Sequence, residues 1–314
     1  MKFITPSALS RLGVLGMNAR NIDYIAGYNK RSLYSIVDNK LLTKKAAQSA
    51  GITVPELLGT IESQWQLRKL GQLLEPHSQF VIKPTRGSGG KGIFVISSRK
   101  KDIFIKPSGR EYRLNDIHRH VNNILSGLYS LGGKPDYAMI EAMINYDPVF
   151  DNYTYEGVPD IRIIVFLGFP VMAMLRCATH SSDGRANLHQ GAIGVGISLS
   201  TGQTLFAVQR NRRIERHPDT DKPFADLCIP HWQQVLELAA GCYEMTSLGY
   251  LGCDMILDRN KGPMILELNA RPGLAIQMAC AAGLKKRLKS IENMEPEERS
   301  MSPAERVHYI QNIF

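Results

Sequence analysis

Three side chains with oxygen donors lie close together near residue 260: Asp254 in CDMIL, and Glu267 and Asn269 in PMILELNARPG. A hairpin that turns near Asn260 would place Asp254 almost opposite Glu267. Side chains alternate along a strand, so Glu267 and Asn269 share a face with Ile265. Carboxylate and amide oxygens are the ligands that Mg²⁺ prefers, and a bridging Glu267 could hold two ions between nucleotide phosphates.

The alternative is that these three residues are polar groups on a solvent-facing strand surface. Their neighbours argue against it, because Met264, Leu266 and Leu268 are apolar and are expected to face the core. An Asp and a Glu in such surroundings more often face a site than open water. The hairpin therefore predicts a metal site.

A glycine-rich loop lies between two short apolar segments, FVIKP at 80–84 and IFVIS at 93–97. Gly87, Gly89 and Gly92 fit the pattern GxGxxG, but a strand former follows where dinucleotide binding requires a helix. The loop also lacks the Gly-Lys-Ser/Thr of a Walker A motif. The remaining interpretation is a strand–loop–strand unit whose backbone N–H groups cover a triphosphate. In this unit Lys83 would reach a phosphate. The alternative is an ordinary Gly/Ser turn with solvated lysines.

The elements that must position these residues alternate between short strands and helices. Apolar periodicity predicts strands at 80–84, 93–97 and 137–144, and helices near 37–50, 64–73, 115–131 and 230–249. Hairpins are predicted over 160–178, within ISLSTGQTLFAV, and from CDMILD to PMILELN. Antiparallel hairpins with helices between them favour an α+β fold over a doubly wound parallel sheet.

Composition sets limits on the class of protein. The 314 residues carry a net charge of +9, which favours anionic partners such as nucleotides, phosphates or acidic peptides. The five cysteines are widely spaced and form no CxxC pair, which fits buried reduced thiols and excludes a zinc site. We find no signal peptide and no apolar run long enough to span a bilayer, so a cytoplasmic location is expected. A homo-oligomer is compatible with the sequence.

The C-terminal segment SPAERVHYIQNIF predicts a short helix. Ser302 would be its N-cap, Pro303 its first residue and Glu305 the partner in a capping box. Val307 and Ile310 would share one face. Either a docked helix or a solvated tail is compatible with this pattern.

Together these segments resemble the ATP-grasp superfamily from Val37 to Gly283. The nearest resemblance is to the glutamate ligases that add amino acids to a ribosomal protein C-terminus or to cofactors, and within them to the alpha-L-glutamate ligase-like (RimK-related) group. The resemblance implies an ATP-grasp fold in which two α+β subdomains clamp ATP between them, with a reduced N-terminal domain. It implies four parts: a short N-terminal segment at 1–36, a subdomain with the glycine loop at 37–139, a subdomain with the metal site at 140–284, and a basic tail with a C-terminal helix at 285–314.

The resemblance also assigns nucleotide contacts by position. Lys40, in VDNKL, and Lys83 would contact ATP phosphate or adenine. Glu141 would begin a hinge whose backbone reads the adenine edge, and Asp147 would bind the ribose. The nucleotide-binding residues implied are Lys40, Lys83, Gly87, Ser88, Gly89, Gly90, Gly92, Glu141, Ala142, Met143, Ile144 and Asp147.

The resemblance assigns the remaining roles to three later motifs, which are DIR at 160–162, NLH at 187–189 and RPG at 271–273. Asp254, Glu267 and Asn269 match the metal ligands. The catalytic residues implied are Arg162, Arg176, Arg271 and His189, and the substrate contacts are Asn187, Arg162, Arg271 and Gly273. His180 is a second candidate base. For each arginine the alternative is a structural or surface ion pair, and for each histidine it is a solvated loop residue.

The mechanism implied is carboxylate–amine ligation. A carboxylate oxygen attacks the γ-phosphate of ATP to give an acylphosphate and ADP, and an amine then displaces phosphate. ATP and Mg²⁺ are the implied cofactors, with two ions expected and Mn²⁺ as a substitute. The expected partners are a small-molecule or peptide carboxylate and an amino-acid amine such as glutamate.

Two other functions are compatible with the same residues. An ATP-grasp kinase would use the same nucleotide site to phosphorylate a small hydroxyl compound. A non-catalytic basic adaptor would bind nucleotide, nucleic acid or an acidic protein. We expect no nucleic-acid partner, because the basic residues are not interleaved with a recognisable aromatic motif.

Overall fold

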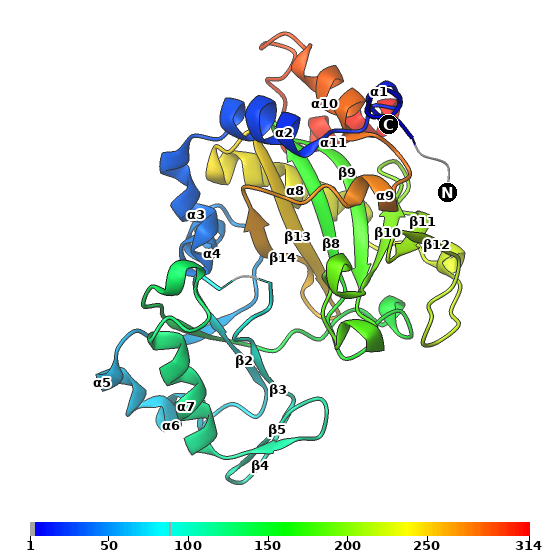
Figure 1. Cartoon of the computed structure of the whole chain (residues 1–314). Coiled ribbons are helices and arrows are strands. Elements are labelled where there is room, and N and C mark those ends of the chain that lie inside the picture. Colours follow the sequence, from blue (N-terminus) through cyan, green and yellow to red (C-terminus); the bar gives the residue numbers. More distant parts are fainter. Residues whose placement is uncertain (1–3, 88) are drawn as a thin grey trace. The chain divides into compact units, whose positions relative to one another are not determined.

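The computed structural model describes residues 4–87 and 89–314 (Figure 1). The chain divides into two compact units. Unit 1 contains the described residues up to Asp38 together with Ala46–Thr53 and Tyr146–Phe314, and unit 2 contains Asn39–Lys45 and Val54–Asn145. Helix α4 (Lys40–Ser49) is divided between the two units after Lys45. Ser88 of the glycine loop lies outside the described residues.

Unit 2 is built on a four-stranded antiparallel sheet of order β1-β7-β2-β3. Its strands are β1 (Leu57–Ile61), β7 (Ala138–Glu141), β2 (Phe80–Pro84) and β3 (Phe94–Ile96). A second, smaller sheet contains β4 (Ser98–Lys100), β5 (Ile103–Ile105) and β6 (Glu111–Tyr112). Around them lie α5 (Gln64–Leu67), α6 (Leu70–Leu74), α7 (Leu114–Leu125) and the 3₁₀ turn η3 (Leu131–Gly133).

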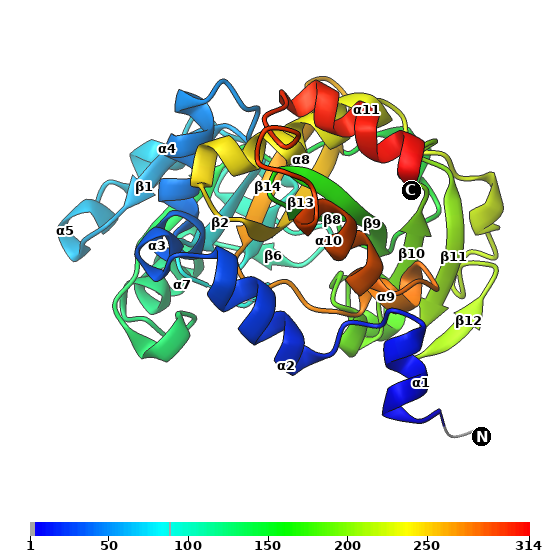
Figure 2. The ribbon, with the colours of Figure 1, turned by 90° about the horizontal axis from the view of Figure 1, so that it is seen from above.

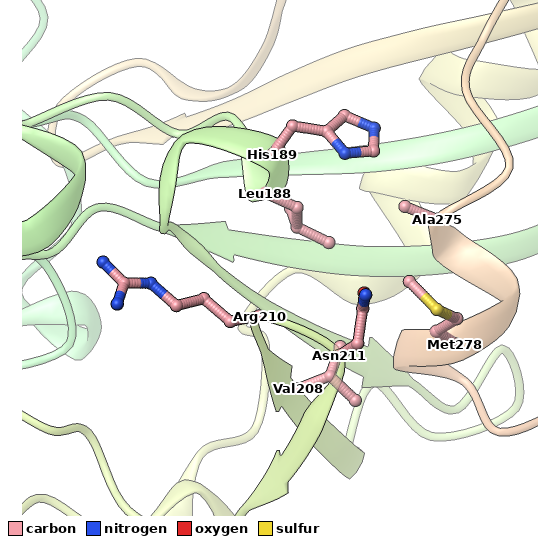
Figure 3. Close-up of a pocket in the computed structure, with 7 residues that line it drawn as sticks. All are labelled: Leu188, His189, Val208, Arg210, Asn211, Ala275 and Met278. Carbon is pink, nitrogen blue, oxygen red and sulfur yellow. The ribbon is translucent and has the colours of Figure 1, made fainter.

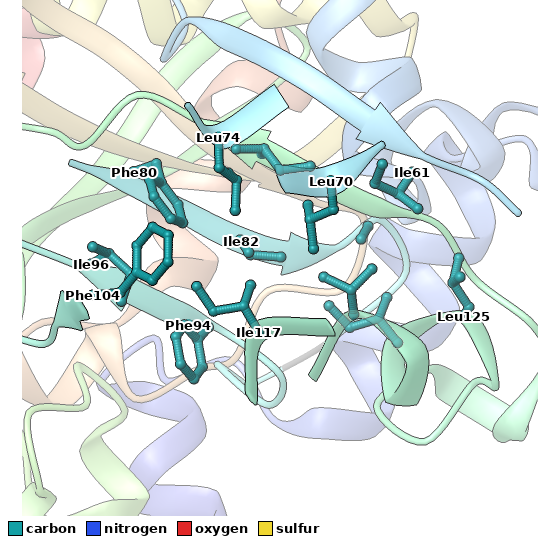
Figure 4. Packing of buried hydrophobic residues seen from close by; sticks show 14 residues of the cluster. Ile61, Leu70, Leu74, Phe80, Ile82, Phe94, Ile96, Phe104, Ile117 and Leu125 are labelled. Atoms are coloured by element: carbon teal, nitrogen blue, oxygen red, sulfur yellow. The ribbon is translucent and has the colours of Figure 1, made fainter. Parts of the chain in front are cut away.

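The core of unit 2 forms where α6 and α7 pack against one face of this sheet. Ile117, Val121 and Ile124 recur at helical spacing along α7 and are fully buried. They meet Phe80 and Ile82, alternate residues of β2, in a single apolar cluster (Figure 4). Each such side chain contributes about 1.5–3 kcal/mol when fully buried. Because strand residues alternate, the opposite face of β2 is left for Val81 and Lys83.

Unit 1 is built on a seven-stranded antiparallel sheet of order β12-β11-β10-β9-β8-β13-β14. The strands, from one edge to the other, are β12 (Arg212–Ile214), β11 (Thr204–Gln209), β10 (Ile193–Ile197), β9 (Phe169–Cys177), β8 (Asp160–Phe166), β13 (Tyr250–Asp258) and β14 (Gly262–Asn269). The central strands β8 and β13 are buried along their whole length.

Helices cover both faces of this sheet. Helices α8 (Trp232–Thr246) and α11 (Pro303–Ile313) pack on one side and the short α9 (Ile276–Ala279) on the other (Figure 2). The other elements of unit 1 are α1 (Pro6–Arg11), α2 (Met17–Ala19), the π-helix η1 (Arg20–Ala26), η2 (Arg31–Leu33), α3 (Tyr34–Asp38), η4 (Pro148–Phe150), η5 (His180–Ser182), η6 (Leu188–Gln190), η7 (Phe224–Asp226) and α10 (Leu284–Glu292). No helix in the described ranges is both long and apolar enough to cross a membrane.

The α+β character expected from the sequence is confirmed, and most predicted elements are present. The C-terminal helix has the expected capping box between Ser302 and Glu305, and its buried face packs on α8 and β9. The helix expected over 115–131 ends at Leu125 instead, because Gly127 takes a left-handed conformation with φ +84° and stops it.

The hairpin of β13 and β14 differs from the sequence prediction at one residue. Asp254 pairs with Glu267, as expected, but the next residue, Met255, pairs with Ile265. Leu266 is therefore the extra residue of a β-bulge and is only half-buried, although it was expected to face the core. A bulge inserts one unpaired residue and interrupts the strict alternation on which that expectation was based.

Candidate active site

The candidate active site of unit 1 is a row of charged side chains on adjacent strands. Arg162 of β8 lies directly opposite Asp254 of β13, and Asp254 lies opposite Glu267 of β14. Directly paired residues of antiparallel strands project from the same face of a sheet. Arg162 binds Asp254 in a bidentate manner, with Nε donating to Oδ1 and Nη2 donating to Oδ2 at 2.6 Å.

Arg176 of β9, whose side chain is 15% exposed, extends this row into a network of four charges, of which the other three are buried. Its Nε and Nη2 donate to the two oxygens of Asp160 at 2.5 Å each, and Nη2 also donates to Oδ2 of Asp254 at 2.8 Å. Asp160 and Asp254 are 5% and 4% exposed, and Arg162 is 8% exposed. Two arginines and two aspartates balance each other, as buried charges must. Asp160 belongs to the DIR motif, but the sequence indicated no separate role for this residue.

The network sets the protonation states of its members. Burial raises the pKa of the Asp254 carboxyl, but Arg162 and Arg176 outweigh burial and hold that pKa below its ordinary value. Burial also raises the pKa of the Asp160 carboxyl, and the negative charge of Asp254 raises it further. Arg176 lowers this pKa but does not outweigh the two, so the pKa of Asp160 stays above its ordinary value. Burial opposes the charge of Arg176, yet the two aspartates raise its pKa above the usual arginine value. Arg176 therefore remains a cation under all ordinary conditions.

The residues expected to hold Mg²⁺ lie together at one end of this row. Glu267 and Asn269 are half-buried, and Oδ1 of Asn269 accepts a hydrogen bond from the backbone N–H of Arg271 at 2.8 Å. Asp254 accepts three hydrogen bonds from the arginines, which leaves one of the roughly four acceptor positions of a carboxylate. Two carboxylates and an amide oxygen fit Mg²⁺ in kind. In the described part of the chain, His, Cys, Asp and Glu side chains form no metal-binding group of three or more.

A second charged cluster lies in unit 2, on the face of β2 opposite its apolar core. Oε2 of Glu141 lies 2.5 Å from Nζ of Lys83, and Oε1 lies 2.7 Å from Nζ of Lys44. Lys44 also donates to the carbonyl of Pro55. Burial raises the pKa of the Glu141 carboxyl, but the two lysines outweigh it and bring the pKa below its ordinary value. The cluster carries one net positive charge.

Sequence reasoning missed Lys44. The signal that could have revealed it is helical spacing, since Leu41, Lys44 and Ala47 lie three residues apart and are all buried in α4. A lysine on an apolar stripe needs an anionic partner.

The glycine loop contacts another lysine of α4. Lys40 donates from Nζ to the carbonyl oxygen of Gly87 at 2.8 Å. Gly89, Gly90 and Gly92 have φ of +62°, +75° and +78°, which residues with a Cβ rarely adopt. A Cβ on Gly92 would also lie 2.6 Å from the ring of Tyr129. The loop conformation therefore depends on glycine.

The expected hinge residues follow β7 directly. Ala142, Met143 and Ile144 are half-buried, and the backbone N–H of Ala142 donates to the carbonyl of Glu56 at 2.9 Å. Asp147 belongs to unit 1, where its carboxylate caps the 3₁₀ turn η4 by accepting from the N–H of Val149. The side chain of Asp147 is thus already used in local structure.

The other expected site residues lie outside the charged network. Asn187 caps η6 by accepting from the N–H of His189, whose imidazole is exposed. Arg271 is 52% exposed on its side chain and lies 3.4 Å from Asp38, and Gly273 is exposed. His180 is exposed, and its ring lies edge-on to Tyr155 at 3.7 Å between centroids. In the described ranges, no hydrogen bond or ion pair joins these residues to Arg162 or Arg176.

A family model described as sugar-transfer associated ATP-grasp matches residues 19–293. The chain belongs to this family. This membership confirms the ATP-grasp superfamily that the sequence resemblance implied. Among curated proteins, none matches the sequence.

Solved structures are similar to the chain at low sequence identity. The ATP-grasp ligase PsnB, complexed with a minimal precursor, is 12% identical over 84% of this chain and 62% of its own, with a TM-score of 0.46. D-alanyl-alanine synthetase A from Vibrio cholerae is 10% identical over 90% of this chain and 65% of its own, also with a TM-score of 0.46. D-alanine–D-alanine ligase from Bacillus anthracis, complexed with ATP, is 13% identical over 90% of this chain and 68% of its own, with a TM-score of 0.44. The chain thus spans less than two thirds of the first two structures.

Proposed function

We propose that this ATP-grasp protein is an ATP- and Mg²⁺-dependent ligase that joins a carboxylate to an amine and releases ADP and phosphate. The observation that carries the proposal is the row Glu267–Asp254–Arg162, in which metal-type oxygen donors and a guanidinium occupy directly paired positions on three strands. Such a row offers both elements needed to stabilise phosphoryl transfer, namely ligands for a cation and a fixed positive charge.

The proposal assigns the binding of ATP and of Mg²⁺ to the following residues. Lys40, Lys83 and the glycine loop bind the phosphates of ATP, and the backbone of Met143 and Ile144 contacts the adenine. Asp254, Glu267 and Asn269 hold Mg²⁺, which when bound supplies positive charge to the β- and γ-phosphates. The set of nucleotide ligands rests on the family match and on the lysine cluster of unit 2.

The reaction then needs two steps. A carboxylate oxygen of the substrate attacks the γ-phosphorus, the bond to ADP breaks, and an acylphosphate forms. The amine attacks the acyl carbon, phosphate leaves, and the amine loses a proton. Arg162 and Arg176 neutralise the developing charge on the transferred phosphoryl group, and His189 is the candidate base for the amine proton. Arg271, Asn187 and Gly273 would contact the substrate.

We further propose that the reaction is amino-acid ligation of the glutamate-ligase type. The motifs NLH at 187–189 and ELNARPG at 267–273 support this substrate class by resemblance. The family description names sugar transfer, so a sugar-bearing carboxylate belongs in the same substrate search. The net charge of +9 favours anionic substrates of either kind.

The test is release of ADP and phosphate from Mg-ATP with a panel of amino acids, short acidic peptides and uronic acids, with hydroxylamine as a general amine. Glu267→Ala should abolish turnover, whereas Glu215→Ala, an exposed glutamate paired only with Arg213 at 3.7 Å, should leave it intact. Substrate-dependent ADP with a hydroxamate product would support ligation. A phosphorylated hydroxyl compound would identify a kinase instead, AMP would indicate adenylation, and full activity of Glu267→Ala would overturn the metal assignment.

A further inference from the structure

A small pocket lies on the sheet of unit 1, toward the edge opposite the charged row. Its walls come from η6, from β11 with the turn that follows it, and from the segment around α9 (Figure 3). The lining residues are Leu188, His189, Val208, Arg210, Asn211, Ala275 and Met278. The lining thus combines an apolar floor with three polar side chains.

Strand register connects this pocket to the charged row. Arg176 of β9 pairs with Gly194 of β10, and Gly194 pairs with Val208 of β11. Directly opposed residues share a face, so Val208 lines the pocket on the same face from which Arg176 reaches Asp160 and Asp254. The pocket is therefore two strands away from the arginine network on one continuous surface.

Two glycines of β10 show that the pocket walls are built closely onto the sheet. A Cβ on Gly194 would lie 2.7 Å from Cδ2 of Leu188, and one on Gly196 would lie 2.4 Å from the carbonyl oxygen of Ala279. Any side chain at these positions would push η6 and α9 away from the sheet. The absence of Cβ at both positions lets Leu188 and the backbone of Ala279 lie directly against β10.

The polar side of the pocket is formed by a tight turn between β11 and β12. Arg210 and Asn211 have φ of +47° and +62°, the left-handed values of a two-residue hairpin turn. Figure 3 shows Asn211 directed toward the space between Leu188 and Met278, whereas the exposed side chain of Arg210 extends away from that space. The nearby Arg213 and Arg216 are paired with Glu215 and Asp221. Within the described residues, Arg210 has no carboxylate partner.

We propose that this pocket binds the distal end of the ligation substrate, an anionic group, either carboxylate or phosphate, carried on a short carbon chain. The inference rests on the proposed function, because it places the reacting carboxylate at Arg176 and the second anion at Arg210. The amide of Asn211 binds the anion, the exposed guanidinium of Arg210 turns toward it when it is bound, and Leu188, Val208 and Met278 contact the carbon chain. The site would select doubly anionic substrates over singly charged ones.

The test measures binding directly and does not depend on turnover. The full chain is labelled on its methionine methyl groups, the Met278 signal is assigned with Met278→Leu, and the protein is titrated with glutarate, inorganic phosphate and uncharged 1,5-pentanediol. Glutarate or phosphate should shift the Met278 signal, and pentanediol should not. Arg210→Gln should weaken that binding about tenfold, the loss expected for one hydrogen bond to a charged group.

Arg212→Gln is the matched control, since Arg212 is an exposed arginine of the same hairpin that does not line the pocket. Unchanged binding in this variant supports the proposal, and a shift with glutarate but not phosphate identifies a dicarboxylate substrate. Equal weakening in both variants, or no shift of Met278 with either anion, overturns it. ATP-dependent turnover measured on the same samples reports separately on the ligase assignment.

Discussion

Nζ of Lys83 lies 2.5 Å from Oε2 of Glu141, in an ion pair whose side chains are 7% and 4% exposed. The second oxygen of Glu141 is bound by Lys44, so one carboxylate holds two ammonium groups in fixed positions. Lys40, on the same helix as Lys44, donates to the carbonyl oxygen of Gly87 in the glycine loop, within the same unit. A lysine ammonium group beside a glycine-rich loop is suited to bind a phosphate.

Replacing Lys44 with methionine should destabilise the fold. Glu141 would lose one of its two lysine donors and the carbonyl of Pro55 would lose its donor, and leaving a buried acceptor unsatisfied costs about 1–3 kcal/mol. The loss should be measured as the free energy of unfolding in urea. Lys45→Met is the matched control, since Lys45 is the exposed neighbour on the same helix and should change stability by about 0.5 kcal/mol at most. Equal effects of the two substitutions would contradict the role given to Lys44.

Acid should remove the stabilisation that Glu141 provides. The pKa of Glu141 is lowered in the folded chain, since the attraction of Lys83 and Lys44 outweighs the effect of burial. The stabilisation is then fully present above the unfolded-state pKa of 4.5 and is lost as pH falls through the folded pKa. The difference in unfolding free energy between the wild type and Glu141→Gln should shrink below pH 4.5. A difference that stays constant down to pH 3 would show that Glu141 is not ionised in the fold.

Arg176→Lys should reduce kcat/KM strongly while leaving the chain folded. Lysine keeps the charge but cannot make the three hydrogen bonds that Arg176 makes to Asp160 and Asp254. Loss of one positioned hydrogen-bond donor at a site where charge develops costs about 100-fold. Steady-state ADP release with the substrate found in the screen measures the loss. Arg213→Lys, in an exposed pair, should alter the rate less than about twofold, and a similar fall in both variants would exclude a specific role for Arg176.

Two glycine substitutions should have opposite effects on stability. Gly196→Ala would place a Cβ 2.4 Å from the carbonyl oxygen of Ala279, so α9 must move, at a cost of about 1–3 kcal/mol. Gly241→Ala lies within α8, where the nearest atom, in Ile52, is 3.9 Å away, and it should stabilise the fold by about 0.5–1 kcal/mol. Thermal unfolding of the two variants checks both signs. A stable Gly196→Ala would show that α9 is not held against β10.

Sequence patterns predicted the hairpin register that brings Asp254 opposite Glu267, because a tight turn leaves few alternatives for pairing. They did not predict the bulge at Leu266, since local sequence gives no signal for an extra residue between paired positions. They also could not reveal that Arg162 and Arg176 share one aspartate, because this depends on which strands become neighbours. Lys44 was missed because two adjacent lysines in a helix are usually solvated, and only its spacing from Leu41 and Ala47 distinguishes it from Lys45.

The pairing of Arg162 with Asp254 joins strands whose contact residues lie 92 positions apart in the chain. Each strand belongs to a local hairpin, β8 with β9 and β13 with β14, that can form early by short-range contacts. The charged network exists only after the two hairpins have docked edge to edge. Phosphate release and the global folding signal should therefore return together in a refolding experiment, whereas the circular dichroism of the separate hairpins should appear first.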